Sequence, residues 1–314
     1  MEHTQTAVMT YSQAILAQVR KAVVGKDGVL LWALAAILAK GHILLEDIPG
    51  VGKTTMALAF SRALGLSCNR VQFNPDVLPS DVTGYSVPDQ QTGNLSYKSG
   101  AVLCNLFLAD ELNRATSRTQ SALLEAMEEG QVTVDGISHK LPTPFTVIAT
   151  QNPAGAAGTQ LLPDSQIDRF MLRLSLGYPE PADEVTMVMT RQGVDPLKQI
   201  QPQVDEATLT ALLQQVANTH VSQAVAQYAV SLVDATRRSD LFLRGGSPRA
   251  TLAEVSLAKA VAQLQGRDYV VPKDVQEVFV RALEHRVQSA PGQDTSVSEL
   301  LTGLLRKVRA PKLR

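Results

Sequence analysis

Short apolar runs separated by stretches with helical spacing dominate the first 180 residues of the chain. Runs of consecutive apolar residues bounded by turn formers are typical of buried strands, whereas apolar residues three and four apart are typical of helices. The expected strands are 43–45, 70–73, 106–108, 145–149 and 171–176. The expected helices are 6–20, 28–40, 56–64, 117–129 and 163–170, with another at 76–82 that Pro79 breaks. This alternation predicts a parallel sheet covered by helices.

After Tyr178 the pattern changes to helical spacing alone, and we expect no strand beyond this point. The expected helices are 182–192, 205–219, 222–238, 248–265, 272–286 and 296–309. A chain that alternates first and is helical later predicts an α/β domain followed by a smaller all-α domain. We place the first domain at residues 1–179 and the second at residues 180–314.

Two hairpins are expected within the α/β domain, at about 84–100 and 131–140. In the first, apolar and polar residues alternate at 85–87 and 95–97 around a polar turn. The second contains Asp135-Gly136, which is the strongest short turn signal in the chain.

The segment Glu46–Thr55 has the pattern of a phosphate-binding loop between an apolar strand and a helix. Gly50 and Gly52 let the backbone wrap around a polyphosphate, and the N–H groups at the helix start point at the anion. Lys53 can reach the β- and γ-phosphates, and the Thr54 hydroxyl can ligate Mg²⁺. The expected nucleotide-binding residues of this loop are Asp47, Pro49, Gly50, Val51, Gly52, Lys53, Thr54 and Thr55.

One position departs from the usual pattern of such loops, because the first glycine position holds Asp47. This residue opens the loop, so a short polar side chain is tolerable there if its backbone φ stays negative. We therefore expect nucleotide binding to remain intact.

Two adjacent carboxylates, Asp110 and Glu111, follow the buried strand at 106–108. Parallel sheets carry their ligand sites at the carboxyl ends of strands. We expect Asp110 to hold Mg²⁺, mostly through water, and Glu111 to be the catalytic base that polarises the water attacking the γ-phosphate. Asn152 ends the next apolar strand, so its amide is expected beside them, within reach of the γ-phosphate or the attacking water.

Two arginines are candidates for phosphate contacts from outside the loop. Arg169 follows a short helix and could stabilise charge on a neighbouring subunit's γ-phosphate, although a pair with Asp168 is an equally good interpretation. Arg249 lies in a first helical turn, where the helix dipole disfavours a cation, and this favours an anionic partner. Arg114 and Arg118 could also face a neighbouring subunit, but a polar helix face explains them at least as well.

Composition narrows the classes of function. The hydrophobic fraction of 45% and the mean hydropathy of 0.00 are typical of a soluble globular protein. The net charge of −1 argues against an electrostatic nucleic-acid binder. Only two cysteines, Cys68 and Cys104, and an N-terminus without an apolar signal segment predict a cytoplasmic location. The longest apolar stretch is too short for a membrane span.

The order of these motifs resembles that of AAA+ ATPases, and most closely that of the MoxR family. The resemblance extends from about residue 20 to residue 290. The matching segments are 44–55, 72–81, 83–84, 108–115, 119–127, 149–153, 162–164, 168–170 and 247–250. It implies an αβα sandwich followed by an all-α lid, with ATP and Mg²⁺ as cofactors and ATP hydrolysis as the reaction.

The resemblance also implies roles that the residues alone do not. Val24-Gly25 would border the adenine pocket, although Lys26 stands where a glutamine is common. Asn152 would be the first sensor, Arg169 a finger acting across a subunit interface, and Arg249 the second sensor on the lid.

Assembly and partners follow from the same resemblance. Members of this family commonly form hexameric rings in which the two hairpins face the pore. They act as chaperone-like ATPases beside a partner with a von Willebrand factor A domain, often to mature or activate a metalloenzyme client.

We therefore expect an ATP-driven remodelling machine in which hydrolysis moves the lid relative to the core, with the nucleotide between them. A motor subunit like that of magnesium chelatase is an alternative that differs mainly in its partner. A nucleic-acid motor is a further alternative, against which the near-neutral charge counts.

Overall fold

A computed structural model describes residues 6–48, 50–88, 94–152, 162–190 and 195–312. Its first part contains a five-stranded sheet in the order β2-β5-β8-β1-β9, in which every neighbouring pair is parallel. The strands are β1 (Ile43–Glu46), β2 (Cys68–Gln72), β5 (Leu106–Asp110), β8 (Thr146–Gln151) and β9 (Leu172–Leu174). The predicted α/β class is therefore confirmed.

The sheet separates two apolar cores, because successive side chains of a strand point to opposite faces. In β1, Ile43 and Leu45 enter the core that contains residues of α1, α2 and α3, whereas Leu44 enters the core formed with α5. The central strands β5 and β8 are buried along their whole length, as expected for a sheet covered on both faces. These helices are α1 (Ala7–Val19), α2 (Asp27–Leu38), α3 (Lys53–Ala63) and α5 (Ser117–Glu129).

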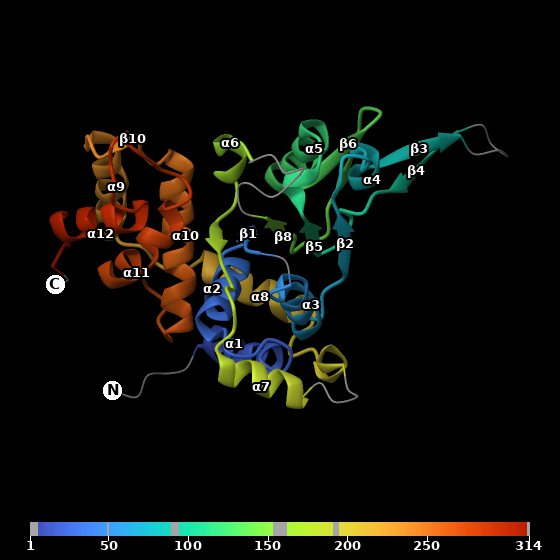
Figure 1. The fold of residues 1–314 in the computed structure, drawn as a ribbon, viewed down its shortest axis with the longest axis horizontal. Coiled ribbons are helices and arrows are strands. Elements are labelled where there is room, and N and C mark those ends of the chain that lie inside the picture. The colour runs from blue at the N-terminus through green and yellow to red at the C-terminus, as the bar shows by residue number, and fades with distance from the viewer. Residues whose placement is uncertain (1–5, 49, 89–93, 153–161, 191–194, 313–314) are drawn as a thin grey trace.

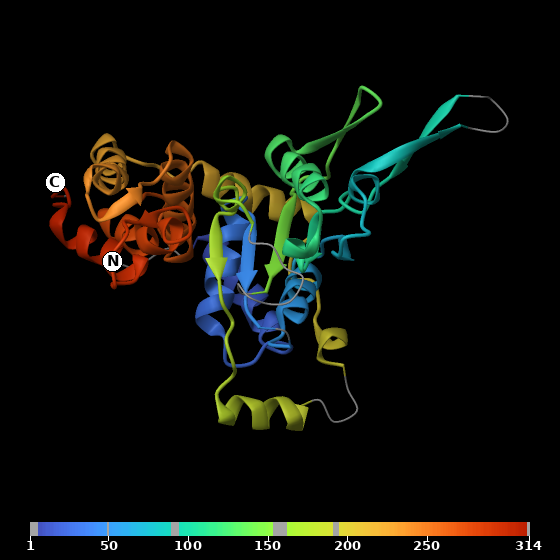
Figure 2. The ribbon, with the colours of Figure 1, turned by 45° about the horizontal axis from the view of Figure 1, so that its top comes forward.

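The parallel strands give the sheet two different edges. We call the edge at which the strands end the carboxyl edge, and the edge at which they begin the amino edge. Strand β9 connects the two, since α6 (Asp164–Ile167) precedes it and α7 (Pro181–Thr190) follows it. Figures 1 and 2 show these two helices at opposite ends of the sheet.

Both predicted hairpins are present and project from the same side of the molecule (Figure 2). The rings of Tyr97 and His139 stack with their centroids 3.6 Å apart, so the two hairpins contact each other. The expectation that Pro79 breaks a helix was wrong, because Pro79 is the first residue of α4 (Pro79–Thr83). At that position its missing N–H and fixed φ favour the helix start. The hairpin strands are β3 (Gly84–Pro88), β4 (Leu95–Ser99), β6 (Gln131–Val134) and β7 (Ile137–Lys140).

The second part of the chain is mostly helical, and α9 to α12 gather beside β9 (Figure 1). The expectation of no further strand was wrong: β10 (Phe242–Arg244) and β11 (Gln288–Ser289) form a small antiparallel pair. Strands of three and two residues are too short to show alternation in the sequence. The helices are α8 (Glu206–Ala217), α9 (Gln223–Arg238), α10 (Pro248–Leu264), α11 (Pro272–Leu283) and α12 (Val297–Lys307), with short 3₁₀ turns at Leu112–Arg114 and Pro196–Gln199.

No helix in the part of the chain that the structure describes combines the length and the apolar character needed to cross a membrane.

An unpaired carboxyl group lies inside the helical part. Glu254 of α10 is fully buried, and neither of its side-chain oxygens has a hydrogen-bond partner among the described residues. Burial raises the pKa of Glu254 well above its ordinary value, because the charged form loses its hydration. The folded protein therefore keeps this carboxyl protonated at a pH at which the unfolded chain has released the proton.

We expect Glu254→Leu to raise the free energy of unfolding at pH 7 by about 1–3 kcal/mol, because it removes a buried polar group without partners. In the parent chain, this residue makes stability fall as the pH rises above about 4.5, the ordinary carboxyl pKa. Urea unfolding monitored by circular dichroism at several pH values measures both effects. Glu254→Gln is the control, since it keeps the shape but cannot titrate. An equal pH dependence in the parent and in Glu254→Gln would contradict the assignment.

Candidate active site

The loop between β1 and α3 has the geometry of an anion site. Gly50 and Gly52 have φ values of +90° and +98°, which other residues adopt only with strain. Gly52 is also the N-cap of α3, whose first turn presents backbone N–H groups without helical partners. Such groups bind anions with the help of the helix dipole. Pro49 lies outside the described residues.

Lys53, the first residue of α3, is buried beneath this loop, and its Nζ donates to the backbone oxygen of Asp47 at 2.5 Å. Burial lowers the pKa of Lys53, and the neighbouring carboxylates of Asp47, Asp110 and Glu111 oppose this shift. The lysine is thus held at the base of the loop, facing the acidic residues.

The side chain of Asp47 braces the loop against the end of β9. Its carboxylate accepts hydrogen bonds from Ser175 Oγ at 2.8 Å and from the backbone N–H groups of Leu176 and Gly177 at 2.5 and 3.1 Å. Asp47 is not among the described residues with positive φ, so the sequence expectation about its backbone is confirmed. The carboxylate points to β9, and these three hydrogen bonds hold it there.

A cavity of about 330 Å³ at the carboxyl edge brings most of the predicted residues together. They arrive from the ends of β1, β5 and β8, because parallel strands finish side by side. The lining residues are Gly50, Gly52, Lys53, Thr54, Thr55, Arg70, Gln72, Asp110, Glu111 and Asn152.

Asp110 is the centre of the hydrogen bonds in this cavity. Thr150 Oγ1 donates to it at 2.6 Å, Arg70 Nη2 donates at 2.8 Å, and Thr54 Oγ1 donates at 3.3 Å. Burial alone would raise the pKa of Asp110, but the bonds from Thr150 and Arg70 outweigh it and hold the pKa below its ordinary value. The residue is therefore a carboxylate at neutral pH.

The backbone of Glu111 has a φ of +56°, a left-handed conformation that is uncommon for a residue with a side chain. Its N–H donates to Thr150 Oγ1 at 2.9 Å, so one threonine hydroxyl links both carboxylate residues. Arg114 Nη1 donates to the Glu111 carboxylate at 2.8 Å. Arg114 thus pairs within its own chain.

Asn152 lines the same cavity as Glu111, as the sequence predicted. Its backbone is clamped by Asn113, which donates from Nδ2 to the Asn152 oxygen at 3.2 Å and accepts at Oδ1 from the Asn152 N–H at 3.4 Å.

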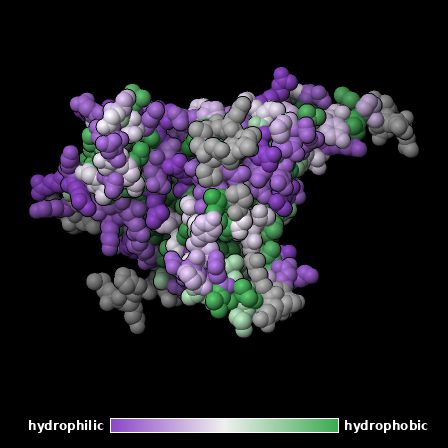
Figure 3. Space-filling view, in the orientation of Figure 1, coloured by the Kyte–Doolittle hydropathy of each residue, from purple (hydrophilic) through white to green (hydrophobic). Residues whose placement is uncertain are grey.

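A second cavity of about 580 Å³ adjoins the first, and the two share Gly50, Gly52 and Thr55. It is mostly apolar: Val23, Val24 and Val51 line one part, and Met187 and Val188 of α7 line another. Its size and apolar lining suit a flat heterocyclic base beside a phosphate cavity. In Figure 3, apolar residues gather at the lower end of the molecule, where α7 lies.

Two contacts hold α7 close to this cavity. Lys26 Nζ donates to the backbone oxygen of Tyr178 at 2.7 Å. Gly25 has a φ of +70°, and a Cβ there would lie 1.8 Å from Asp183 Oδ2. The left-handed φ and this close approach both favour glycine at position 25.

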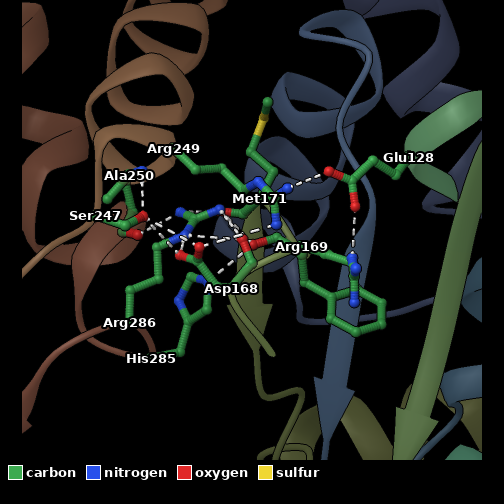
Figure 4. Close-up of polar contacts among 11 residues, drawn as sticks. Glu128, Asp168, Arg169, Met171, Ser247, Arg249, Ala250, His285 and Arg286 are labelled. Carbon is green, nitrogen blue, oxygen red and sulfur yellow. Dashed lines mark hydrogen bonds and ion pairs between the residues drawn. The ribbon is translucent and has the colours of Figure 1, made fainter. Parts of the chain in front are cut away.

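The arginines Arg169 and Arg249 lie elsewhere. Both donate to the carboxylate of Glu128, Arg169 Nε at 2.9 Å and Arg249 Nη2 at 2.5 Å (Figure 4). Arg169 precedes β9 and Glu128 ends α5, so this cluster lies near the amino edge, opposite the two cavities. Arg249, which the sequence placed among the nucleotide-binding residues, is therefore not brought together with Lys53 and Asp110 of its own chain.

The loop that carries Arg169 is anchored to the helical part by residues that sequence reasoning missed. Arg286, 1% exposed, donates to the Asp168 carboxylate at 3.1 Å and to the Phe170 oxygen at 2.7 Å. Burial lowers the pKa of Arg286 to about 10, opposed by Asp168. Ser247, the N-cap of α10, also donates to Asp168, at 3.1 Å (Figure 4).

The sequence analysis also missed Arg70 and Gln72, which line the cavity of about 330 Å³ beside Lys53 (the phosphate cavity), and Thr150, which bonds Asp110 from the buried strand. Arg70 and Gln72 are two apart and point to the same side of β2, which is the signal that could have identified them. Thr150 follows the apolar residues 147–149 of β8 and directly precedes Gln151-Asn152.

Comparisons with known proteins agree with this geometry. Residues 42–172 match the ATPase family associated with various cellular activities (AAA), and residues 234–302 match the AAA lid domain. The uncharacterised protein YeaC of Bacillus subtilis (strain 168) is 42% identical, over 87% of this chain and 85% of that protein. Chaperone MoxR1 of Mycobacterium tuberculosis is 37% identical, over 98% of this chain and 84% of that protein.

A crystal structure described as that of a "putative ATPase" from Cytophaga hutchinsonii superimposes with a TM-score of 0.86 and 33% identity, covering 97% of both chains. Protein MoxR of Paracoccus denitrificans is 29% identical, over 90% of both. The chain belongs to the MoxR family of AAA+ ATPases.

Proposed function

We propose that this ATPase works as an oligomeric ring that couples Mg²⁺-dependent ATP hydrolysis to the remodelling or activation of a client protein. One observation carries the proposal: the phosphate cavity and the Arg169–Arg249 pair lie at opposite edges of one sheet. Two copies packed edge to edge would bring the arginines of one copy to the phosphates of the other, and repetition of this contact closes a ring.

The proposed reaction is in-line attack of water on the γ-phosphorus. The N–H groups of the loop and Lys53 bind the phosphate chain, so that charge developing on its oxygens is stabilised by fixed donors. Glu111 accepts the proton of the attacking water, and Asn152 orients that water or the γ-phosphate. Because Arg114 holds Glu111 at 2.8 Å, the carboxylate must exchange this contact for the water.

The oxygen donors of Thr54 and Asp110 fit Mg²⁺. They lie 3.3 Å apart beside the loop, and Mg²⁺ prefers hydroxyl, carboxylate and water oxygens to nitrogen or sulfur. When bound, the ion would neutralise charge on the β- and γ-phosphates. Arg70 occupies the same Asp110 oxygen as Thr54, so it would shift toward the phosphates.

The hairpins are the proposed contact with the client. Their exposed apolar residues Tyr85, Leu95 and Ile137 are 47%, 65% and 63% exposed, which suits contact with apolar segments of a protein. We place them toward the pore of a hexamer beside a partner with a von Willebrand factor A domain. A motor subunit like that of magnesium chelatase would use the same site and differ in this partner.

We expect Lys53→Ala to abolish nucleotide binding, because it removes the cation that faces the phosphates and leaves the acidic residues unopposed. Glu111→Gln should bind ATP with near-normal affinity and lower kcat by roughly a hundred-fold or more, since it loses only the proton acceptor. Titration with a fluorescent ATP analogue and a phosphate-release assay separate the two effects. Glu125→Gln, on an exposed part of α5, is the control. Normal turnover by Glu111→Gln would remove Glu111 as the base.

Arg169→Ala and Lys53→Ala should each be inactive alone and partly active when mixed. In a mixed ring, a Lys53→Ala subunit donates its intact Arg169 to the ATP of an Arg169→Ala neighbour, so roughly a quarter of the interfaces in an equal mixture are complete. ATPase assays across mixing ratios measure this rescue. A mixture as inactive as its components would place the arginine in its own subunit's site.

A further inference from the structure

Glu128 is the only residue among those described that bonds both Arg169 and Arg249. Its Oε2 accepts from Arg169 Nε at 2.9 Å, and its Oε1 accepts from Arg249 Nη2 at 2.5 Å (Figure 4). The hydrogen bond from Arg169, together with the charge of Arg249, lowers the pKa of Glu128 and keeps it ionised. One anion therefore joins an arginine of the core to an arginine of the helical part.

The two segments that carry the arginines are held in place by other contacts. Asp168, beside Arg169, is bonded by the buried Arg286 and by Ser247, which precedes Arg249 by two residues. These bonds tie the loop of Arg169 to the start of α10 without help from Glu128. Removal of Glu128 would take the shared anion from both guanidinium groups and leave these segments in place, with Arg249 Nη1 still 4.0 Å from Asp168 Oδ2.

This site is open to a ligand. Glu128 and Arg249 side chains are each 40% exposed, and a hollow of about 230 Å³ borders them together with Met127, Arg169 and His42. Two guanidinium groups around a shared anion are the arrangement that recognises phosphate oxygens. The carboxylate of Glu128 thus takes the place that a phosphate group would fill.

Glu128 also belongs to the helix that leads into the second hairpin. It lies in the last turn of α5, and only Glu129 and the left-handed C-cap Gly130 separate it from β6. Just before it, Met127 is fixed, because its backbone oxygen accepts from His42 Nε2 at 3.1 Å. Glu128 therefore lies between Met127, whose backbone is fixed, and the hairpin, so a movement of Glu128 is passed to the hairpin and not back along the helix.

We propose that Glu128 is a gating carboxylate that holds the arginine pair until the γ-phosphate of ATP on the neighbouring subunit displaces it. The displacement frees the end of α5, and the β6–β7 hairpin changes position with it. This inference rests on the proposed function, since it requires the arginines to act on a neighbour's nucleotide. It names the signal by which the nucleotide state of one subunit reaches the hairpin of the next.

The ion pairs of Glu128 are weak enough for a phosphate group to replace them. Ion pairs between partly exposed side chains are weak, whereas the terminal phosphate offers more charge and three oxygens to the same two arginines. The stacked rings of Tyr97 and His139 carry movement of the second hairpin to the first.

The first test measures ATPase activity of Glu128→Gln as a function of protein concentration. Glutamine keeps the shape but releases the arginines, so activity at low protein concentration should rise roughly three- to ten-fold, as expected for the loss of two weak ion pairs. Glu129→Gln is the matched control, because Glu129 is the exposed next residue with the same charge. Activity of Glu128→Gln equal to or below that of the control would overturn the gate.

The second test uses hydrogen exchange of residues 131–140. In nucleotide-free Glu128→Gln these amides should exchange faster than in the parent protein, while exchange in the central strands β5 and β8 stays unchanged and shows an intact fold. In the parent protein carrying Glu111→Gln, saturating ATP should produce the same acceleration. Hairpin exchange that is identical in both comparisons would overturn the proposal.

The arginine variants separate this inference from the proposed function. If Arg169→Ala and Arg249→Ala keep full ATPase activity, the arginines do not act on a neighbour, and both proposals fall. If both variants are inactive and Lys53→Ala rescues them in mixtures, while Glu128→Gln behaves like Glu129→Gln, the gate alone falls.

Discussion

The parallel direction of all five strands is the constraint on which the rest of this structure depends. Because β1, β5 and β8 end at the same edge, Lys53, Asp110 and Asn152 meet in one cavity although they are far apart in the sequence. The same constraint puts Arg169, which precedes β9, at the other edge. One chain thus carries both halves of the proposed hydrolytic site, facing away from each other, and this asymmetry is the basis of the proposed ring.

Much of this could be predicted from the sequence, because the signals were local. Apolar runs identified the strands, and the rule for parallel sheets was enough to group Thr54, Asp110 and Glu111. The position of the lid could not be predicted, since Ser247-Pro248 identifies the start of a helix but not the surface against which it packs. Arg286 was missed for the same reason, because it anchors the Arg169 loop through backbone oxygens that are far from it in the sequence.

The buried Arg286 explains why the lid and the Arg169 loop behave as one unit in this structure. Its guanidinium is 1% exposed and bonds carbonyl oxygens of Asp168, Phe170, Met171 and Ala282 in addition to a carboxylate. Breaking such a buried pair by removing one partner costs about 3–5 kcal/mol, because a desolvated charge is left without compensation. This anchor between the Arg169 loop and the lid is therefore stronger than an exposed ion pair.

The ion pairs of Glu128 are of the opposite kind, and the contrast decides which contact can act as a switch. Each involves side chains that are 29–40% exposed, for which about 0–1 kcal/mol is typical. A phosphate offers both arginines more charge than this carboxylate does, whereas separating the lid from the Arg169 loop would also break the buried bonds of Arg286. ATP bound to a neighbouring subunit would therefore break the ion pairs of Glu128 at the end of α5, next to the β6–β7 hairpin. The buried contacts of Arg286 behind the arginines would stay in place.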